Sequence, residues 1–166
     1  MKLRHGAAVL LFVLAGCGKE IAQVAAIEPG AGTACALDGM VLKDYPGPKA
    51  QIHYKEGAPE FFCDLMELFT TLLDPEQKRP VAGLFVQDMG KTSWEKPEGQ
   101  WIDAKAALYV VGSKKPGSMG PTYGSFASAQ DAEAFAQKEG GKVLRFEQIT
   151  REMHNQPGSA HDSKMH

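Results

Sequence analysis

The sequence lacks the closely spaced cysteine and histidine pairs that mark common zinc sites. Its 166 residues hold three cysteines and five histidines, with no CxxC or HxxxH spacing. Charge of one sign is not in excess either, because the formal net charge is −2 and no basic patch indicates a nucleic-acid partner. No apolar run reaches the ~20 residues of a permanent membrane-spanning helix. These absences argue against a zinc-binding domain built on closely spaced ligand pairs, a nucleic-acid-binding protein and a membrane-spanning protein.

The first residues are typical of an export signal. Lys2 and Arg4 precede a short apolar run at 6–14, and "LAGC" ends it at Cys17. This pattern resembles the lipobox of bacterial lipoproteins, in which the cysteine is acylated and the preceding peptide is removed. We therefore expect a signal peptide at 1–16 and a lipid anchor on Cys17 that faces the periplasm. Inner and outer membrane both stay open, and an ordinary signal peptide with a chance cysteine is the alternative.

The mature chain is long enough for one compact domain or two small units. Residues 17–33 are small and polar and predict a lipidated, flexible tether. Hydrophobic patterns and turn residues predict helices at 59–72 and after Ser128, ended by Gly140 and Gly141, and strands at 50–54, 81–89, 101–112 (most clearly 106–111) and 142–149.

The order of these elements is repeated along the chain. It indicates an α+β fold of two similar ββαβ units, at 34–95 and 96–150, with a disordered, flexible tail at 151–166. The first strand of each unit is the least defined by the pattern. In the first unit we expect it near 40–44.

Cys35 and Met40 are the first candidate metal ligands, in the stretch "CALDGM". Gly39 permits a tight turn between them, so that the two sulfur atoms can converge. Thiolate and thioether sulfur are soft donors that select Cu(I), whereas carboxylates suit hard ions. The competing interpretation is a buried cysteine and a core methionine, since both side chains fill apolar gaps well.

Met119 and Cys63 are further sulfur candidates. Met119 lies in "GSMGP" within the long loop 113–128, and long loops that persist in compact domains are often functional. Cys63 lies early in the predicted helix, where a helix N-terminus favours the thiolate. Its aromatic neighbours Phe61 and Phe62 favour a buried structural cysteine instead.

The C-terminal tail concentrates histidine. His154, His161 and His166 lie there, accompanied by Met153 and Met165. A polar tail rich in these residues predicts a flexible arm that collects metal, or alternatively a disordered end without a role.

The islands "CALDGM", "YPGP", "FFC" and "GSMG" follow one another in an order that resembles the NosL family. Those proteins are lipoprotein copper chaperones for the maturation of nitrous oxide reductase, and the resemblance covers about residues 33–150. It implies a fold similar to part of the organomercury-cleaving lyase. It also implies a Cu(I) carrier, not an enzyme, which delivers its ion to the apo-enzyme through an ABC-type membrane assembly.

The ligand motifs of the family fall on Cys35, Met40 and Met119, with Cys63 and the three tail histidines in reserve. Many members carry a second cysteine where this chain has Leu37-Asp38, so two local cysteine ligands are excluded. Two other interpretations stay open. One is a thiol-dependent enzyme related to the lyase, with Cys35 and Cys63 as nucleophiles and Asp38 as proton donor. The other is a structural lipoprotein with a Cys35–Cys63 disulfide.

Overall fold

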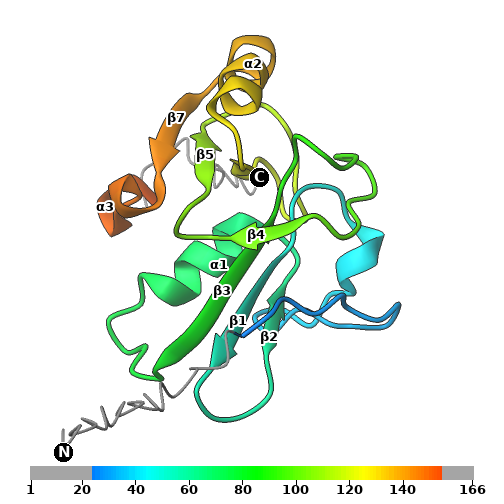
Figure 1. Cartoon of the computed structure of the whole chain (residues 1–166), viewed down its shortest axis with the longest axis vertical. Coiled ribbons are helices and arrows are strands. Elements are labelled where there is room, and N and C mark those ends of the chain that lie inside the picture. Colours follow the sequence, from blue (N-terminus) through cyan, green and yellow to red (C-terminus); the bar gives the residue numbers. More distant parts are fainter. Residues whose placement is uncertain (1–23, 155–166) are drawn as a thin grey trace, which may run out of the picture.

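The computed structural model describes residues 24–154, which form an α+β fold with two antiparallel sheets (Figure 1). The strands are β1 (Ala50–Tyr54), β2 (Glu60–Phe62), β3 (Val81–Gln87), β4 (Trp101–Asp103), β5 (Leu108–Val111), β6 (Gly124–Phe126) and β7 (Lys142–Arg145). The helices are α1 (Leu65–Leu72), α2 (Ala129–Glu139) and α3 (Arg151–His154), with short 3₁₀ helices η1 (Leu42–Asp44) and η2 (Phe146–Gln148).

Both sheets are built around their first strand. The larger sheet has the order β2-β1-β3-β4 and the smaller one the order β6-β5-β7, with every neighbouring pair antiparallel. In each sheet the first strand pairs with the next strand and with the strand that follows the helix. The order strand, strand, helix, strand therefore occurs twice along the chain, and β4 adds an edge to the larger sheet.

Strand β1 is buried along its whole length because both faces of the larger sheet are covered. Ile52, with Leu84 opposite it on β3, faces the core beneath α1. Gln51 points to the other face, which the residues before β1 cover. The predicted strand at 50–54 is confirmed.

Residues 24–30, the N-terminal strap, lie against this second face. The amide of Gln51 mimics a strand partner for Ile27: its Oε1 accepts from the Ile27 N–H at 2.9 Å, and its Nε2 donates to the Ile27 carbonyl at 3.0 Å. The Nε1 of Trp101 donates to the carboxylate of Glu28 at 2.7 Å. The described part of the predicted tether is thus bonded to the sheet.

The first long helix begins later than its apolar pattern predicts. The expected helix at 59–72 is wrong in its first turns, because 60–62 form β2 and pair with β1, and α1 begins at Leu65. Asp64 marks the start, since its carboxylate accepts hydrogen bonds from two backbone N–H groups of the first turn. Pro59 therefore precedes a strand, because hydrogen bonding to β1 outweighs the helical periodicity of this segment.

Other boundaries also move. The predicted strand at 101–112 is divided into β4 and β5 by a turn, and the predicted strand at 142–149 ends at Arg145 and continues as η2. The strand expected near 40–44 is wrong, since η1 lies there. The first four residues of the predicted tail form α3.

The second helix agrees with its sequence signals. The hydroxyl of Ser128 accepts a hydrogen bond from the Asp131 N–H at 3.1 Å and caps α2. Gly140 ends the helix with φ +79°, a conformation that favours glycine.

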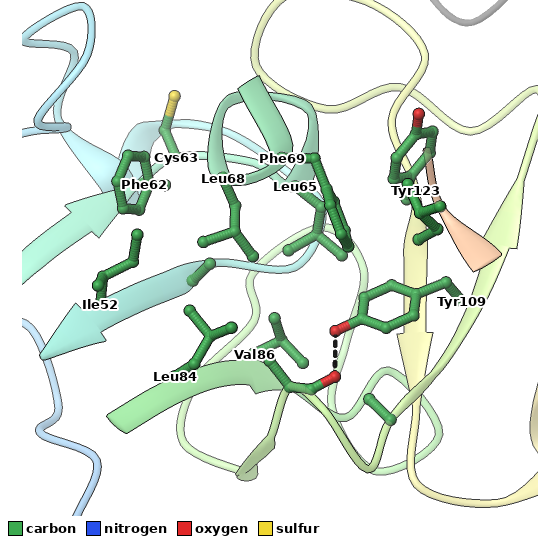
Figure 2. Close-up of a cluster of buried hydrophobic side chains, with 14 of the residues drawn as sticks. Ile52, Phe62, Cys63, Leu65, Leu68, Phe69, Leu84, Val86, Tyr109 and Tyr123 are labelled. Carbon is green, nitrogen blue, oxygen red and sulfur yellow. Dashed lines mark hydrogen bonds between the residues drawn. The ribbon is translucent and has the colours of Figure 1, made fainter. Parts of the chain in front are cut away.

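The main hydrophobic core takes side chains from both sheets (Figure 2). Phe69 of α1 packs edge-on against Tyr109 of β5, with ring centroids 5.3 Å apart, and also contacts Tyr123. The Tyr109 hydroxyl donates to the Ala104 carbonyl at 2.6 Å. A smaller cluster around Phe126 lies under α2. Over residues 24–154, no helix combines the length and apolarity needed to cross a bilayer.

Candidate metal site

Two cysteines and two carboxylates distant in sequence meet at the end of β2. Cys35, Asp38, Cys63 and Glu67 each offer one ligand atom, and these four atoms lie within 4.8 Å of one another. We call this group the thiol–carboxylate cluster. Both cysteines are buried, and both are free thiols in the structure.

A tight turn positions Cys35. Its N–H donates to the Met40 carbonyl at 2.8 Å, and its carbonyl accepts from Gly39 at 3.0 Å. Gly39 has φ +78°, a backbone conformation that most residues avoid. The Ala36 N–H donates to the Phe61 carbonyl at 2.8 Å and fixes the turn to β2. The tight turn that Gly39 permits is therefore present, while the expected convergence of the Cys35 and Met40 sulfur atoms stays a prediction.

Cys63 follows β2 directly and precedes the cap of α1. Figure 2 shows its sulfur pointing away from the aliphatic side chains of the core. The side chain is completely buried by the surrounding segments. Cys63, held in reserve on sequence grounds, thus lies at the cluster.

Glu67 is the centre of the cluster and was missed by the sequence analysis. Its Oε2 lies 2.9 Å from the Sγ of Cys35 and 2.9 Å from the Sγ of Cys63, and accepts a hydrogen bond from each thiol. It also accepts from the Cys63 N–H at 3.2 Å. The pattern "DLME" is a capping-box sequence and could have placed a helix start at Asp64 with Glu67 turned back toward Cys63.

Asp38 lies in the turn between Cys35 and Met40 and belongs to the cluster. Its Oδ1 accepts from the Met40 N–H at 2.8 Å, and its Oδ2 lies 3.9 Å from the Sγ of Cys63. Burial raises its pKa, but the bond from Met40 and contacts with Glu67 and the two thiols outweigh this and lower the pKa overall. Asp38 therefore offers an ionised carboxylate at the exposed side of the cluster.

The two thiols differ in their proton affinity. A hydrogen bond from Cys63 is the largest influence on Cys35, and together with Glu67 it lowers the pKa of Cys35 to about 6. The same bond, burial and Glu67 raise the pKa of Cys63. Burial, with Cys35 beside it, raises the pKa of Glu67 to about 8. The opposite directions of these shifts mean that Cys35 gives up its proton more easily than Cys63, which makes it the better metal ligand of the two.

Lys49 places a buried positive charge behind the cluster. Its Nζ donates to the carbonyls of Tyr45, Pro46 and Cys63 at 2.8, 3.0 and 2.9 Å, which uses all three protons. Burial lowers its pKa to about 8, while the negative groups of the cluster and Asp64 raise it. Lys49 thus fixes the backbone at Cys63 and offsets part of the negative charge there.

Residues 117–120, the GSMG loop, lie beside the cluster. The Oδ2 of Asp64 accepts from the Ser118 N–H at 3.2 Å and from its hydroxyl at 2.6 Å. Gly117 allows this close approach, since a Cβ there would lie 2.7 Å from a methyl group of Thr122 and 3.0 Å from Asp64. Met119 follows Ser118 and is 58% exposed. Its thioether is therefore carried at the rim of the site.

The remaining candidate ligands are distributed as follows. Met40 is half-buried and packs against the core next to Cys35. The nitrogens of His154 lie 2.9 Å from the Thr70 hydroxyl and 3.1 Å from the Tyr123 hydroxyl, so this histidine lies against α1 and not at the cluster. Cys17, His161 and His166 lie outside the described residues.

Two buried thiols beside a loop-borne thioether are donors for a soft metal ion. Fold and site together thus define a candidate metal-binding protein of the α+β class. The family model described as NosL matches residues 26–154, and the chain belongs to the NosL family.

Characterised relatives agree with this membership. The chain is 42% identical over 164 residues to the "Copper-binding lipoprotein NosL" of Stutzerimonas stutzeri, covering 96% of this chain and 86% of the relative. It is 40% identical over 155 residues to the protein of the same name from Achromobacter cycloclastes, covering 88% and 79%. The crystal structure of the copper chaperone NosL from Shewanella denitrificans superposes with a TM-score of 0.73 at 41% identity, covering 78% of this chain and 97% of that one.

Proposed function

We propose that the chain is a copper carrier of the cell envelope, which holds one Cu(I) and hands it on without catalysing a reaction. One observation carries the proposal: the fold brings the buried sulfur of Cys35 next to that of Cys63 and places the Met119 loop beside them. Relatives at about this level of similarity are described as copper-binding lipoproteins and a copper chaperone. Soft sulfur donors select Cu(I) over hard ions, which supports the oxidation state.

The ligand set that we propose is Cys35, Cys63 and Met119, with Met40 as an additional thioether. His154 is left out because its ring lies against Thr70 and Tyr123, away from the cluster. A set of few donors with an exposed thioether suits a carrier, since a closed cage of four ligands would release its ion slowly. Transfer would proceed by exchange with ligands of the acceptor.

Membrane attachment through an acylated Cys17 is the second part of the proposal. It rests on the lipobox and on the lipoprotein names of the relatives. In this location the body of the protein faces the periplasm, on the inner or the outer membrane. The acceptor that we propose is nitrous oxide reductase, reached through the ABC-type maturation assembly that the family resemblance implies.

We also infer that the fold arose from two related ββαβ units, at 34–95 and 96–150, similar to those of the organomercury-cleaving lyase. Two sheets with the same arrangement around their first strand support this inference. The candidate site is then assembled from both units, because the cluster lies in the first and Met119 in the second.

An anaerobic titration of the reduced protein with Cu(I), against a competing chelator, tests the proposal. We expect one tightly held ion per chain. Cys35→Ser and Cys63→Ser should weaken binding by about 100-fold or more, since even outer-sphere partners of a metal cost 10- to 100-fold when removed. Met119→Leu should weaken it by about tenfold, which corresponds to ~1.4 kcal/mol.

Met66→Leu is the matched control, because Met66 is a partly buried core methionine on α1. It should keep the affinity of the wild type. Unchanged affinity in both cysteine variants would contradict the proposed site. Copper transfer to metal-free nitrous oxide reductase tests the acceptor, and failure of the loaded protein to raise the copper content of that enzyme would contradict the delivery step.

A thiol-dependent reaction is the second candidate function. The observation in its favour is that the Asp38 carboxylate lies 3.9 Å from the Cys63 sulfur, within the same cluster as Cys35. Family membership favours the carrier. If the protein cleaved an organomercury substrate and Asp38→Asn abolished this activity, the thiol-dependent reaction would be preferred over the carrier function.

A further inference from the structure

We propose that Cys35 and Cys63 form a reversible redox pair, which low-molecular-weight disulfides oxidise to an intramolecular bridge. The bridged form offers no free thiol at the cluster and cannot hold Cu(I), whereas a bound ion blocks the oxidation. This gating of copper uptake rests on the proposed function. It differs from a structural disulfide, because the fold is complete while both cysteines are free thiols.

The two sulfur atoms are close enough for a bridge to form after a small movement. They lie within 4.8 Å of each other, and a disulfide bond is ~2.05 Å long. Each thiol donates to the same oxygen of Glu67 at 2.9 Å, so both sulfur atoms face one space. The bond from the Ala36 N–H to the Phe61 carbonyl, at 2.8 Å, holds the turn of Cys35 against β2. Rotation of the two side chains can therefore close the bridge.

Exposure sets the order in which the two thiols react. Cys35 is 4% exposed and lies in a turn whose residues 36–39 are exposed, whereas Cys63 is completely buried. A small movement of this turn brings Cys35 into contact with an external disulfide, while Cys63 stays inside. An outer attacking cysteine next to an inner resolving cysteine is the arrangement of redox-active pairs.

The oxidation is a thiol–disulfide exchange. The Cys35 sulfur attacks one sulfur of the external disulfide, whose S–S bond breaks and releases the first thiol. The Cys63 sulfur then attacks the Cys35 sulfur of the mixed disulfide and releases the second thiol. Two electrons pass from the two cysteines to the external disulfide, and the two cysteine protons end on the two released thiols.

Glu67 makes the bridge reversible. In the reduced form its Oε2 accepts hydrogen bonds from both thiols and from the Cys63 N–H. Oxidation removes the two S–H donors and leaves only the backbone donor of these three. Glu67 is 7% exposed, and a buried acceptor that loses its partners costs free energy. The surroundings therefore stabilise the dithiol over the disulfide, which suits a switch and not a permanent bridge.

Trapping of free thiols in the full chain, reduced and metal-free at the start, tests the inference. The protein is equilibrated without oxygen in mixtures of reduced and oxidised glutathione, and its thiols are then alkylated with a maleimide. We expect intact mass and peptide mapping to show one Cys35–Cys63 bridge in oxidising mixtures and its loss in reducing ones. In oxidised glutathione alone, one equivalent of Cu(I) added beforehand should slow bridge formation more than about tenfold.

Variants test the order of attack and the role of the carboxylate. Cys63→Ser should accumulate the mixed disulfide at Cys35, because no second thiol resolves it. Cys35→Ser should react more than about tenfold more slowly, since its remaining thiol is completely buried. At a fixed glutathione mixture, Glu67→Gln should raise the ratio of bridged to reduced protein about tenfold, because the charged acceptor of both thiols is gone. Glu76→Gln is the matched control, an exposed acid beyond α1 and outside the cluster, and should keep the ratio of the wild type.

Absence of the bridge in every mixture would overturn the inference, and so would a bridge that persists in excess reduced glutathione, because such a bridge is structural. Equal Cu(I) affinity of the bridged and the reduced chain would rule out the gating. Failure of the reduced chain to bind Cu(I) would instead contradict the proposed function and leave the redox pair standing. If circular dichroism shows that Glu67→Gln does not fold, the wild type and Cys63→Ser decide alone.

Discussion

Glu67 shows how one side chain can change the chemistry of its surroundings. At the third position of a capped helix, a glutamate usually reaches back to the N–H of the capping residue. Here it reaches one residue further, to the Cys63 N–H and to both thiols. This arrangement places a buried carboxylate between two sulfur atoms. The same residue therefore belongs to the first turn of α1 and joins the two cysteines of the cluster.

His154 provides a prediction at the scale of one residue. Burial lowers its pKa below the ordinary 6.5, while the charge of Asp64 opposes this, and Asp74 and Arg151 border the adjacent pocket. Below about pH 6.5 His154 therefore takes up a proton more readily in the unfolded chain than in the folded protein. The stability that neutral His154 contributes is thus lost as the pH falls from about 6.5 through the folded-state pKa. We expect the difference in unfolding free energy between wild type and His154→Gln to shrink as the pH falls from 7.5 to 5.5.

Urea denaturation of the reduced, metal-free proteins across this range measures the difference. Each unit of pKa shift corresponds to about 1.4 kcal/mol. Since His53 also has a lowered pKa in both proteins, its contribution cancels in the comparison. A difference that does not vary with pH would contradict the prediction.

Residue types in the sequence predict part of the candidate site. Cys35, Met40 and Met119 were expected from sulfur chemistry and resemblance, and the structure places Cys35 in the cluster. Cys63 was undervalued because its aromatic neighbours indicated burial, and burial is indeed complete. A buried cysteine can still be a ligand, because the direction in which the Cys63 sulfur points depends on where β2 ends and α1 begins. Glu67 could not be assigned to a sulfur site without the pairing of the Cys35 turn with β2.

At the scale of elements, α1 and the GSMG loop are joined by a single carboxylate. One oxygen of Asp64 caps the helix and the other accepts two hydrogen bonds from Ser118. Asp64 is 2% exposed, so neither role is shared with solvent. The helix that presents Glu67 and the loop that presents Met119 are therefore held in a fixed relation.

We predict that Asp64→Ala destabilises the protein by about 1–3 kcal/mol, because it removes a helix cap and leaves buried donors unpaired. It should also weaken Cu(I) binding by displacing the GSMG loop. A double-mutant cycle measures this, since Met119→Leu should cost less in the Asp64→Ala background than in wild type. Strictly additive effects would show that Asp64 does not act through the loop.

Ser128→Ala is the control for this experiment. It removes the cap of α2, which lies away from the cluster, and should cost about 1 kcal/mol of stability with no change in copper affinity. A loss of affinity there would attribute the effect of Asp64 to general destabilisation.

Sequence signals located elements better than their ends. Ser128 and Gly140 fix both ends of α2 through local hydrogen bonding and backbone conformation, so that helix was predictable. The start of α1 was not, because "EFFCDLMELF" satisfies helical periodicity while 60–62 also complete the edge of a sheet formed with distant residues. Local pattern cannot decide between these outcomes when long-range pairing is the stronger term.

At the scale of the whole molecule, the two sheets share one core. Phe69 of α1 contacts Tyr109, Tyr123 and Phe146, all of which come from the second half of the chain. Each sheet alone would leave much of this apolar surface exposed. The two halves are therefore expected to be stable only together.

We predict a single unfolding transition for both sheets and a loss of about 3–5 kcal/mol of stability in Phe69→Ala, which removes a buried ring from the shared core. Two tryptophans report on the two sheets separately, because Trp101 belongs to β4 of the larger sheet and Trp94 stacks on Phe135 of α2, which packs on the smaller sheet, with ring centroids 5.1 Å apart. Each single-tryptophan variant, Trp94→Phe and Trp101→Phe, is unfolded in urea and followed by the fluorescence of its remaining tryptophan. The two midpoints should coincide once the loss of stability caused by each substitution is taken into account. Clearly separated transitions within one variant, by fluorescence and circular dichroism, would contradict a shared core.

The exposure of Met119 has a consequence for the order of events in copper transfer. The sulfur donors are graded by depth: Met119 is 58% exposed, Cys35 is 4% exposed and Cys63 is 0% exposed. Under the proposed function, an arriving ion meets the thioether before the thiols, and an acceptor can compete for the outermost donor while the inner ones still hold the metal. Release would then use the same ligand exchanges as loading in the reverse order, and the ion would stay bound to at least one sulfur throughout the transfer.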